Sequence, residues 1–251
     1  MRKPFTHAIG GVLSADIAVP NHPRELNFYS RILTTGDAPL WRDDLMNNLG
    51  TPVIGLGVRT AEYESLPLQW MPHFQVVDVE SSAKRASELG GTVLMQPETS
   101  EWAVLVDPHG AAFGVIPVVT RKSSDKEEIG GCISWLSLTV PNAQSSRDFY
   151  QQVVGWNGKS IDFENDESNA AKFEMQIDDE TAAAEICQGD CEDAAVPAVW
   201  LLHLPVGDFD ESLQRVRENG GEVVKEIAET QNAVIRDPVG VYLAIQGPSM
   251  I

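Results

Sequence analysis

The chain has 251 residues, of which 43% are hydrophobic and 22% charged, as in globular proteins rather than disordered or membrane-spanning ones. Its net charge of −19 would repel phosphate groups, which argues against a nucleic-acid partner and suits a cationic small-molecule ligand. No apolar run is long enough for a membrane span or a signal peptide. Cys132, Cys187 and Cys191 do not form a disulfide framework, so we expect reduced thiols in a cytoplasmic protein.

The chain begins with the pattern of a strand followed by a helix. Apolar and polar residues alternate over 12–19, which predicts a half-buried strand. Asn21 is expected to cap a helix that runs to Leu33, with Leu26 and Tyr29 on its inward stripe. Short strands are expected next, of which 52–58 is the clearest.

The same pattern restarts in the middle of the first half. Residues 70–76 predict a strand, and Asp78 is expected to cap a helix that ends at Gly90–Gly91. Residues 102–106 and 112–118 then predict a hairpin around the turn-forming sequence D-P-H-G.

The second half of the chain repeats the first. Residues 10–21 match 131–142, and the motif W-x-x-H-x-x-V-x-D occurs at Trp70–Asp78 and again at Trp200–Asp208. Two copies of one module explain this ordered repeat. We therefore predict a first domain at 1–120, a charged linker at 121–129 and a second domain at 130–251.

Each half is itself doubled, so a β-α-β-β-β unit is expected four times. The helix of each unit would cover one face of its sheet and leave the other free, which makes a cup suited to a ligand. The pattern predicts an α+β fold.

The ordered motifs resemble those of the vicinal oxygen chelate superfamily, which includes glyoxalases, bleomycin resistance proteins and extradiol dioxygenases. The matching segments are V-P-N…F-Y at 19–29 and 140–150, E-L-G-G-T-V at 88–93, N-G-G-E-V at 219–223, and D-P-x-G at 107–110 and 237–240. The resemblance implies tandem glyoxalase-like domains, each of two paired β-α-β-β-β units forming a cupped mixed sheet with helices outside. It is compatible with a monomer of two pseudo-symmetric domains or with a homodimer.

The resemblance also implies positions for the ligands of a divalent metal, on the first and last strands of the units. Counted from the matched motifs, these positions hold Ser14, Met71, Gly114, Trp135, Leu201 and Ala244. Divalent metals are bound by imidazole or carboxylate groups, which none of these residues carries. We therefore expect neither a metal nor another cofactor.

Candidate catalytic residues lie two positions further along the first strands. Asp16 and His73 are expected to face the cup and to approach each other, which would raise the histidine pKa for general base catalysis. The alternative is a structural hydrogen bond that only joins two units. In the second half the corresponding pair is Ser137 and His203, with Glu174 or Glu185 as a possible source of a carboxylate.

Other polar and aromatic residues are expected to line the cup as ligand-binding residues. They are Ser14, Gln75, Trp135, Ser137, Tyr242 and Gln246. The aromatic ones suit a flat or cationic ligand and equally suit core packing. Three hypotheses follow: a metal-free protein that binds a small molecule, a lyase or isomerase that uses Asp16 with His73, or His203, or a protein in which one half has lost its pocket and serves only for domain pairing. Whether the protein is an enzyme stays open.

Overall fold

The computed structural model describes residues 1–119, 131–161, 171–189 and 196–248. Within these ranges the chain forms two mixed β-sheets, of six and eight strands, and four α-helices. This confirms the predicted α+β class. The predicted linker at 121–129 and Cys191 lie outside the described residues.

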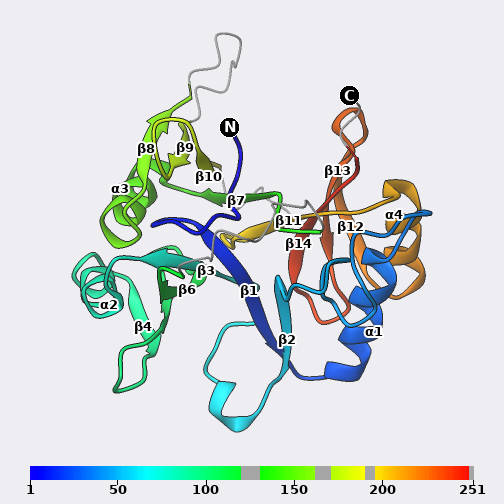
Figure 1. The fold of residues 1–251 in the computed structure, drawn as a ribbon, viewed down its shortest axis with the longest axis horizontal. Coiled ribbons are helices and arrows are strands. Elements are labelled where there is room, and N and C mark those ends of the chain that lie inside the picture. The colour runs from blue at the N-terminus through cyan, green and yellow to red at the C-terminus, as the bar shows by residue number, and fades with distance from the viewer. Residues whose placement is uncertain (120–130, 162–170, 190–195, 249–251) are drawn as a thin grey trace. The chain divides into compact units, whose positions relative to one another are not determined.

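Figure 1 shows the order of the elements. The first half contains β1 (Val12–Val19), α1 (His22–Leu33), β2 (Ile54–Val58), β3 (Met71–Val76), α2 (Val79–Glu88), β4 (Thr92–Met95), β5 (Ala103–Val106) and β6 (Ala112–Pro117). The second half contains β7 (Trp135–Val140), α3 (Ala143–Val153), β8 (Asn157–Ser160), β9 (Lys172–Gln176), β10 (Ala182–Gln188), β11 (Leu201–Pro205), α4 (Phe209–Glu218), β12 (Glu222–Ile227), β13 (Asn232–Arg236) and β14 (Tyr242–Gln246).

Helices α1 and α2 begin at the caps that the sequence predicts, and α4 begins at the equivalent residue of the second motif copy. The side chains of Asn21, Asp78 and Asp208 each accept a hydrogen bond from a backbone N–H of the first turn. A cap satisfies one of the backbone donors that a helix start leaves unpaired. The Glu211 carboxylate, three residues after the Asp208 cap, accepts from the backbone N–H of Gly36 at 2.9 Å.

The inward stripe of α1 differs from the prediction. Its buried positions are Glu25, Phe28, Tyr29, Ile32 and Leu33, whereas Leu26 is only half-buried. Residues spaced by three and four share one helix face, so the stripe through Tyr29 and Leu33 includes position 25. A carboxyl group therefore lies inside the apolar layer.

Three of the four units have the predicted β-α-β-β-β order. The first has only β1, α1 and β2 as its α-helix and strands, and the chain between α1 and β2 forms turns with one isolated bridge, Trp41 to Asn47. Gly36 and Pro39 interrupt the alternation that a strand needs. The Trp41 indole anchors this segment by donating to the Pro205 carbonyl at 2.7 Å.

The compact units of the structure combine elements from both sequence halves. Unit 1 comprises the described residues of Met1–Leu13, Met71–Ser123 and Trp135–Trp200, and unit 2 comprises those of Ser14–Trp70, Ser124–Ser134 and Leu201–Ile251. Each unit thus takes one repeat from each half, and the boundaries 1–120 and 130–251 describe the repeat in the sequence rather than these units.

Unit 1 is built from two equivalent four-stranded runs. Strands β3 and β6 are parallel, with β5 and β4 following antiparallel, and β7 and β10 are parallel, with β9 and β8 following in the same way. Helices α2 and α3 pack on these strands and on each other. An aromatic cluster fills the core, made of Phe74, Phe113, Phe149, Tyr150, Trp156 and Trp200.

Unit 2 has the shorter first module and a complete last one. Strands β1 and β2 are parallel, and β11 pairs parallel with β14, which is followed antiparallel by β13 and β12. Helix α1 packs against α4. Edge-to-face contacts of Tyr29 with Phe28 and Trp70 form the aromatic part of the core.

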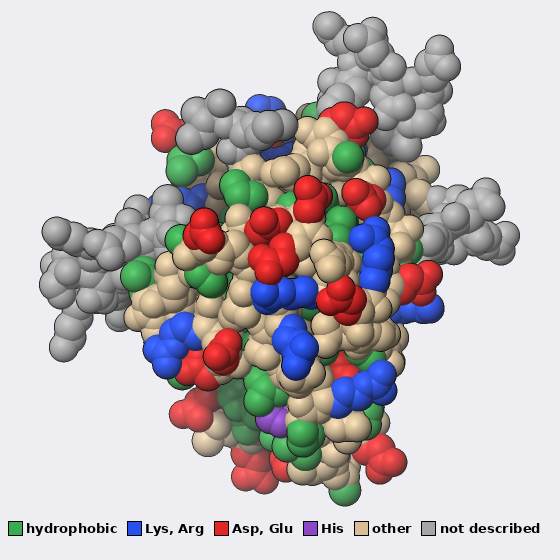
Figure 2. All heavy atoms as spheres, turned by 90° about the vertical axis from the view of Figure 1, so that its right-hand side faces the viewer, with side chains coloured by type: hydrophobic (Ala, Val, Ile, Leu, Met, Phe, Trp, Pro, Cys, Tyr) green, Lys and Arg blue, Asp and Glu red, His purple; other side chains and the backbone are tan. Residues whose placement is uncertain are grey.

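The surface carries charges of both signs despite the large negative total. On the face drawn in Figure 2, acidic and basic side chains are interspersed. Ion pairs within unit 2, such as Arg217 with Glu226 at 3.4 Å, contribute to this mixture. Among the helices of the described residues, none is long and apolar enough to cross a membrane.

Candidate functional site

The first strand of each module places one polar residue beside the last strand of the same module. In the parallel registers, Asp16 lies opposite Gly55, His73 opposite Gly114, Ser137 opposite Glu185, and His203 opposite Ala244. The four pairs are equivalent by the internal repeat. They are the positions at which the sequence predicts the site.

In unit 1 the imidazole of His73 lies over Gly114. A Cβ atom at residue 114 would stand 2.5 Å from the His73 Cδ2 atom, which is closer than real Cβ contacts come. The family resemblance puts a glutamate ligand at this position. With His73 in place there is no room for any side chain at residue 114, so the histidine occupies the space that this ligand would need.

Unit 2 repeats this arrangement with a carboxylate. A Cβ atom at Gly55 would stand 2.1 Å from Oδ1 of Asp16, so the carboxylate lies over the glycine. In the last module of the same unit, the half-buried His203 faces the register position of the buried Ala244. Asp16 and His203 therefore belong to one compact unit, and His73 and Ser137 to the other.

The predicted pairs Asp16 with His73 and Ser137 with His203 each draw one member from each unit. Their approach therefore stays a prediction. The side chains of His73, Ser137 and His203 are half-buried and that of Asp16 is exposed.

The side chain of Gln75 is occupied by backbone groups, although the sequence predicts that it binds a ligand. It is fully buried, donates to the carbonyls of Thr6 at 2.6 Å and Gly11 at 3.3 Å, and accepts from the N–H of Val119 at 3.0 Å. Buried amides of this kind hold backbone segments together. Gln75 thus joins the N-terminal segment at Thr6–Gly11 and the segment at Val119 to β3, and its amide is not available to a ligand.

The remaining predicted ligand-binding residues divide between the units. Ser14, Tyr242 and Gln246 are half-buried in unit 2, and the Gln246 Oε1 atom accepts from the hydroxyl of Ser134 at 2.7 Å. In unit 1 Trp135 is buried. Its ring is contacted by a cation that the sequence does not predict: the Arg2 guanidinium carbon lies 4.4 Å from the ring centroid.

The repeated tryptophan of W-x-x-H-x-x-V-x-D has a structural role. In unit 1 the Trp200 indole donates to the Tyr150 hydroxyl at 2.9 Å, and this hydroxyl donates to Asp107 Oδ2 at 3.1 Å. The other oxygen of Asp107 accepts from two N–H groups of its own D-P-x-G turn. Burial raises the pKa of Asp107 and raises that of Tyr150 well above its usual value.

Unit 2 contains the same network, built from the other copies of the motifs. The Trp70 indole donates to the Tyr29 hydroxyl at 3.1 Å, and Tyr29 donates to Asp237 Oδ2 at 2.7 Å. Both networks are buried and satisfied, and each links an F-Y motif from one half of the sequence to a D-P-x-G turn from the other. They stabilise the pairing of modules rather than forming a reaction centre.

Glu25 lies beside the network of unit 2. It is fully buried, and apart from an interaction with the Asp237 carboxyl its oxygens have no hydrogen-bond partner among the described residues. Burial, together with the charge of Asp237, raises the pKa of Glu25 to about 7, while Arg24 acts in the opposite direction. The equivalent position in unit 1 is Ser146, which is also buried with its hydroxyl unpartnered in the described part of the chain.

The residues at the family's metal positions do not fit a divalent cation. Of the six, Ser14 alone carries an oxygen atom in its side chain, and a side chain at residue 114 would have to displace the His73 imidazole. Within the described ranges, no group of three or more His, Cys, Asp or Glu side chains is arranged to hold a metal ion.

Comparisons with known proteins agree with this fold. Residues 14–116 match the model of the family described as a glyoxalase-like domain, and residues 132–245 match that of the glyoxalase/bleomycin resistance protein/dioxygenase superfamily. A relative from Streptomyces peucetius, the anthracycline biosynthesis protein DnrV, is 26% identical over 191 residues, which cover 73% of this chain and 67% of that protein.

Two solved structures show the same fold. The halotolerant catechol dioxygenase BphC superposes with a TM-score of 0.54 at 13% identity, covering 97% of this chain and 88% of that one. The Mn(II)-bound glyoxalase from Novosphingobium aromaticivorans has a TM-score of 0.51 at 15% identity, covering 96% and 82%. Together with the family matches in both halves, these similarities show that the chain belongs to the glyoxalase/bleomycin resistance protein/dioxygenase superfamily, also called the vicinal oxygen chelate superfamily, as two tandem domains.

Proposed function

We propose that this protein binds a small organic molecule on the open faces of its sheets, without the divalent metal of its superfamily. The observation that carries the proposal is the content of the metal positions. They hold no imidazole or carboxylate, and the His73 imidazole lies over Gly114, where the family's glutamate would stand. A sheet face of this fold without metal ligands can still bind a small molecule, which supports the proposal.

A ligand with aromatic or cationic character fits the chain best. The net charge of −19 attracts cations, and Trp135 already has a guanidinium group against its ring. The relative from Streptomyces peucetius is named for anthracycline biosynthesis, which supports including an anthracycline among the compounds tested. Nucleic acids and membranes are not proposed as partners.

The alternative function is a metal-independent lyase or isomerase. The half-buried state of His73 and His203 favours it, because a general base has to reach its substrate while partly shielded from water. In this reaction class His73 with Asp16, or His203, would remove a proton next to an activated carbon. The two functions differ in whether the bound compound is converted.

We also propose that the protein is cytoplasmic. Cys132 and Cys187 are free thiols, as expected in a reducing compartment.

The first test is metal analysis of protein purified without chelator. We expect less than stoichiometric nickel, zinc, iron and manganese. A full equivalent of any of them would contradict the metal-free proposal.

The second test is a thermal-shift screen of organic cations and aromatic compounds, an anthracycline included. Variants His73→Ala and His203→Ala are compared with His109→Ala, whose histidine lies in the β5–β6 turn away from the site. We expect stabilisation by a ligand to fall in at least one of the first two variants and to persist in the third. Equal stabilisation in all three would remove both histidines from the site, and conversion of the ligand would favour the enzyme.

A further inference from the structure

The N-terminal segment of unit 1 places an arginine on an aromatic and acidic surface. The Arg2 guanidinium carbon lies 4.4 Å from the centroid of the Trp135 ring, and its Nη2 atom lies 3.4 Å from Glu185 Oε2. Trp135 is the first residue of β7, and Glu185 lies on the neighbouring strand β10. Aromatic faces and carboxylates are the two groups that guanidinium ions prefer in proteins.

Trp135 and Glu185 are buried more deeply than the Arg2 guanidinium that they contact. Trp135 is 4% exposed and the Glu185 side chain 15%, whereas the Arg2 side chain is 57% exposed. Lys172 shares the carboxylate, with its Nζ atom 3.0 Å from the same Oε2. An exposed guanidinium gains little from such contacts, so it can be exchanged for another cation.

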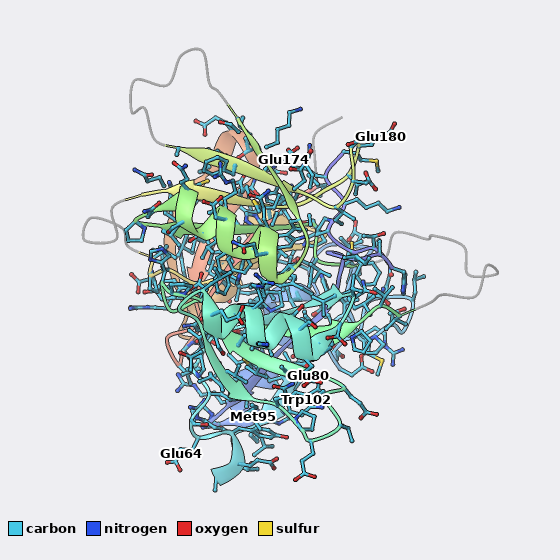
Figure 3. The ribbon with its side chains drawn as sticks, turned by 90° about the vertical axis from the view of Figure 1, so that its left-hand side faces the viewer. Glu64, Glu80, Met95, Trp102, Glu174 and Glu180 are labelled. Carbon is cyan, nitrogen blue, oxygen red and sulfur yellow. The ribbon has the colours of Figure 1, made fainter. Side chains whose placement is uncertain are left out.

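The segment around Arg2 is anchored by its backbone and not by this side chain. Lys3 N–H donates to the Ala182 carbonyl and Ala182 N–H to the Met1 carbonyl, both at 2.9 Å. Ala182 begins β10, directly after the turn that carries Glu180, which Figure 3 labels. The guanidinium can therefore leave the Trp135 ring by side-chain rotation while the segment stays in place.

The indole of Trp135 also has an unmet donor. Its Nε1 atom is buried and has no hydrogen-bond partner among the described residues. The tryptophans of the two buried networks do have acceptors. An unsatisfied buried N–H is costly, and an oxygen atom of a ligand would remove that cost.

We infer that Trp135 and Glu185 form a binding site for the guanidinium or primary ammonium group of a ligand, and that Arg2 occupies this site in the free protein. A ligand with an oxygen acceptor near its cation would in addition satisfy the Trp135 indole. This inference rests on the proposed small-molecule function and names the class of ligand for the cup of unit 1. Arg2 acts as a tethered competitor of that ligand.

Removal of the competitor should strengthen binding. The probe is butylguanidinium, with butylurea as its neutral analogue of similar shape, and binding is followed by calorimetry and by tryptophan fluorescence. We expect Arg2→Ala to bind butylguanidinium about three- to fivefold more tightly than the unmodified protein, because the exposed Arg2 guanidinium covers the Trp135 ring for most of the time but is held there only weakly. Butylurea should not bind detectably to either protein.

Two further variants test whether the site is the one inferred. Adding Glu185→Gln to Arg2→Ala should weaken butylguanidinium binding by about tenfold or more, because the carboxylate is lost while the side-chain shape is kept. Arg42→Ala is the matched control, since Arg42 is 52% exposed and pairs with Asp44 at 2.7 Å in unit 2. It should leave binding unchanged.

Equal affinity of the unmodified protein and Arg2→Ala for butylguanidinium would overturn the inference and leave Arg2 with a purely structural role. Arg2→Ala removes an exposed side chain and keeps the backbone anchors, so its folding is not at risk and this comparison decides the matter alone. If other compounds bind in the thermal-shift screen and butylguanidinium does not, this inference fails while the proposed function stands. If no compound binds, both fail.

Discussion

Replacing Glu25 with glutamine should change how the stability of the protein depends on pH. Glu25 is fully buried on α1, apart from an interaction with the Asp237 carboxyl its oxygens have no hydrogen-bond partner among the described residues, and its pKa is raised from 4.5 to about 7. The main cause is burial, and the neighbouring Asp237 carboxyl adds to it. The folded protein therefore holds a proton on Glu25 over a range in which the unfolded chain has lost it.

The sign and the size of the effect follow from linkage. Because the folded state binds the extra proton, the free energy of unfolding falls as the pH rises from about 4.5 through about 7. Above that range Glu25 is ionised in both states and its full cost is present. The difference between the two pKa values corresponds to about 3 kcal/mol. Glu25→Gln removes the charge while keeping the shape, so the gain should appear only at the higher pH.

Urea unfolding of the unmodified protein and the variant, followed by tryptophan fluorescence, measures this gain. At about pH 8 we expect Glu25→Gln to be more stable by up to about 3 kcal/mol, and at about pH 5 this difference should shrink to about 1 kcal/mol or less. Ser146→Ala, at the equivalent buried position of unit 1, is the control and should show no pH dependence of its own. A stability difference that is the same at both pH values would refute the reasoning, since it could not come from ionisation of Glu25.

Three further predictions concern other buried groups. Tyr150→Phe removes the hydroxyl that joins the indole and the carboxylate of its network and should cost about 1–3 kcal/mol in urea unfolding; a cost near zero would show that the network contributes little. Gly114→Ala should lower the free energy of unfolding by about 1–3 kcal/mol, because the new methyl group would collide with the His73 imidazole. In a double-mutant cycle, His73→Ala should largely cancel this loss, and additive effects of the two substitutions would contradict the prediction. In a background with Cys132→Ser and Cys191→Ser, Cys187 should react slowly with thiol reagents at about pH 8, since burial raises its pKa to about 11; rapid modification of the folded protein would contradict this.

Much of the secondary structure was predictable because its causes are local. The caps at Asn21, Asp78 and Asp208 bond N–H groups three residues further along, and the Asp107 turn bonds groups two and four residues away. The prediction of the buried face of α1 was wrong. Leu26 was expected inside α1, and the structure buries Glu25 instead, because the stripe that packs includes position 25.

The candidate site was predictable only as a set of strand positions. Counting from the repeated motifs placed His73 two residues past Met71 on the same face of its strand, and the structure adds that it lies opposite Gly114 with its imidazole over that glycine. Gln75 looked like a ligand-binding residue because it shares a face with His73, but its amide is bonded to backbone groups more than forty residues away. Arg2 carried no signal at all, since its contact with Glu185 spans 183 residues.

The sequence by itself determined the repeat and the element order of three of the four units, because periodicity, caps and turn residues act between near neighbours, and its ordered motifs carried the resemblance to the superfamily. The tertiary structure alone decided which modules join. Tyr29 bonds Asp237 and Tyr150 bonds Asp107, so the F-Y motif of each half meets the D-P-x-G turn of the other. The two copies of each motif are nearly identical in the sequence, and no local pattern can tell a motif which copy is its partner. Contacts between side chains far apart in the sequence select the partner: the buried hydrogen bonds of Tyr29 and Tyr150, and the packing of Arg2 on the Trp135 ring.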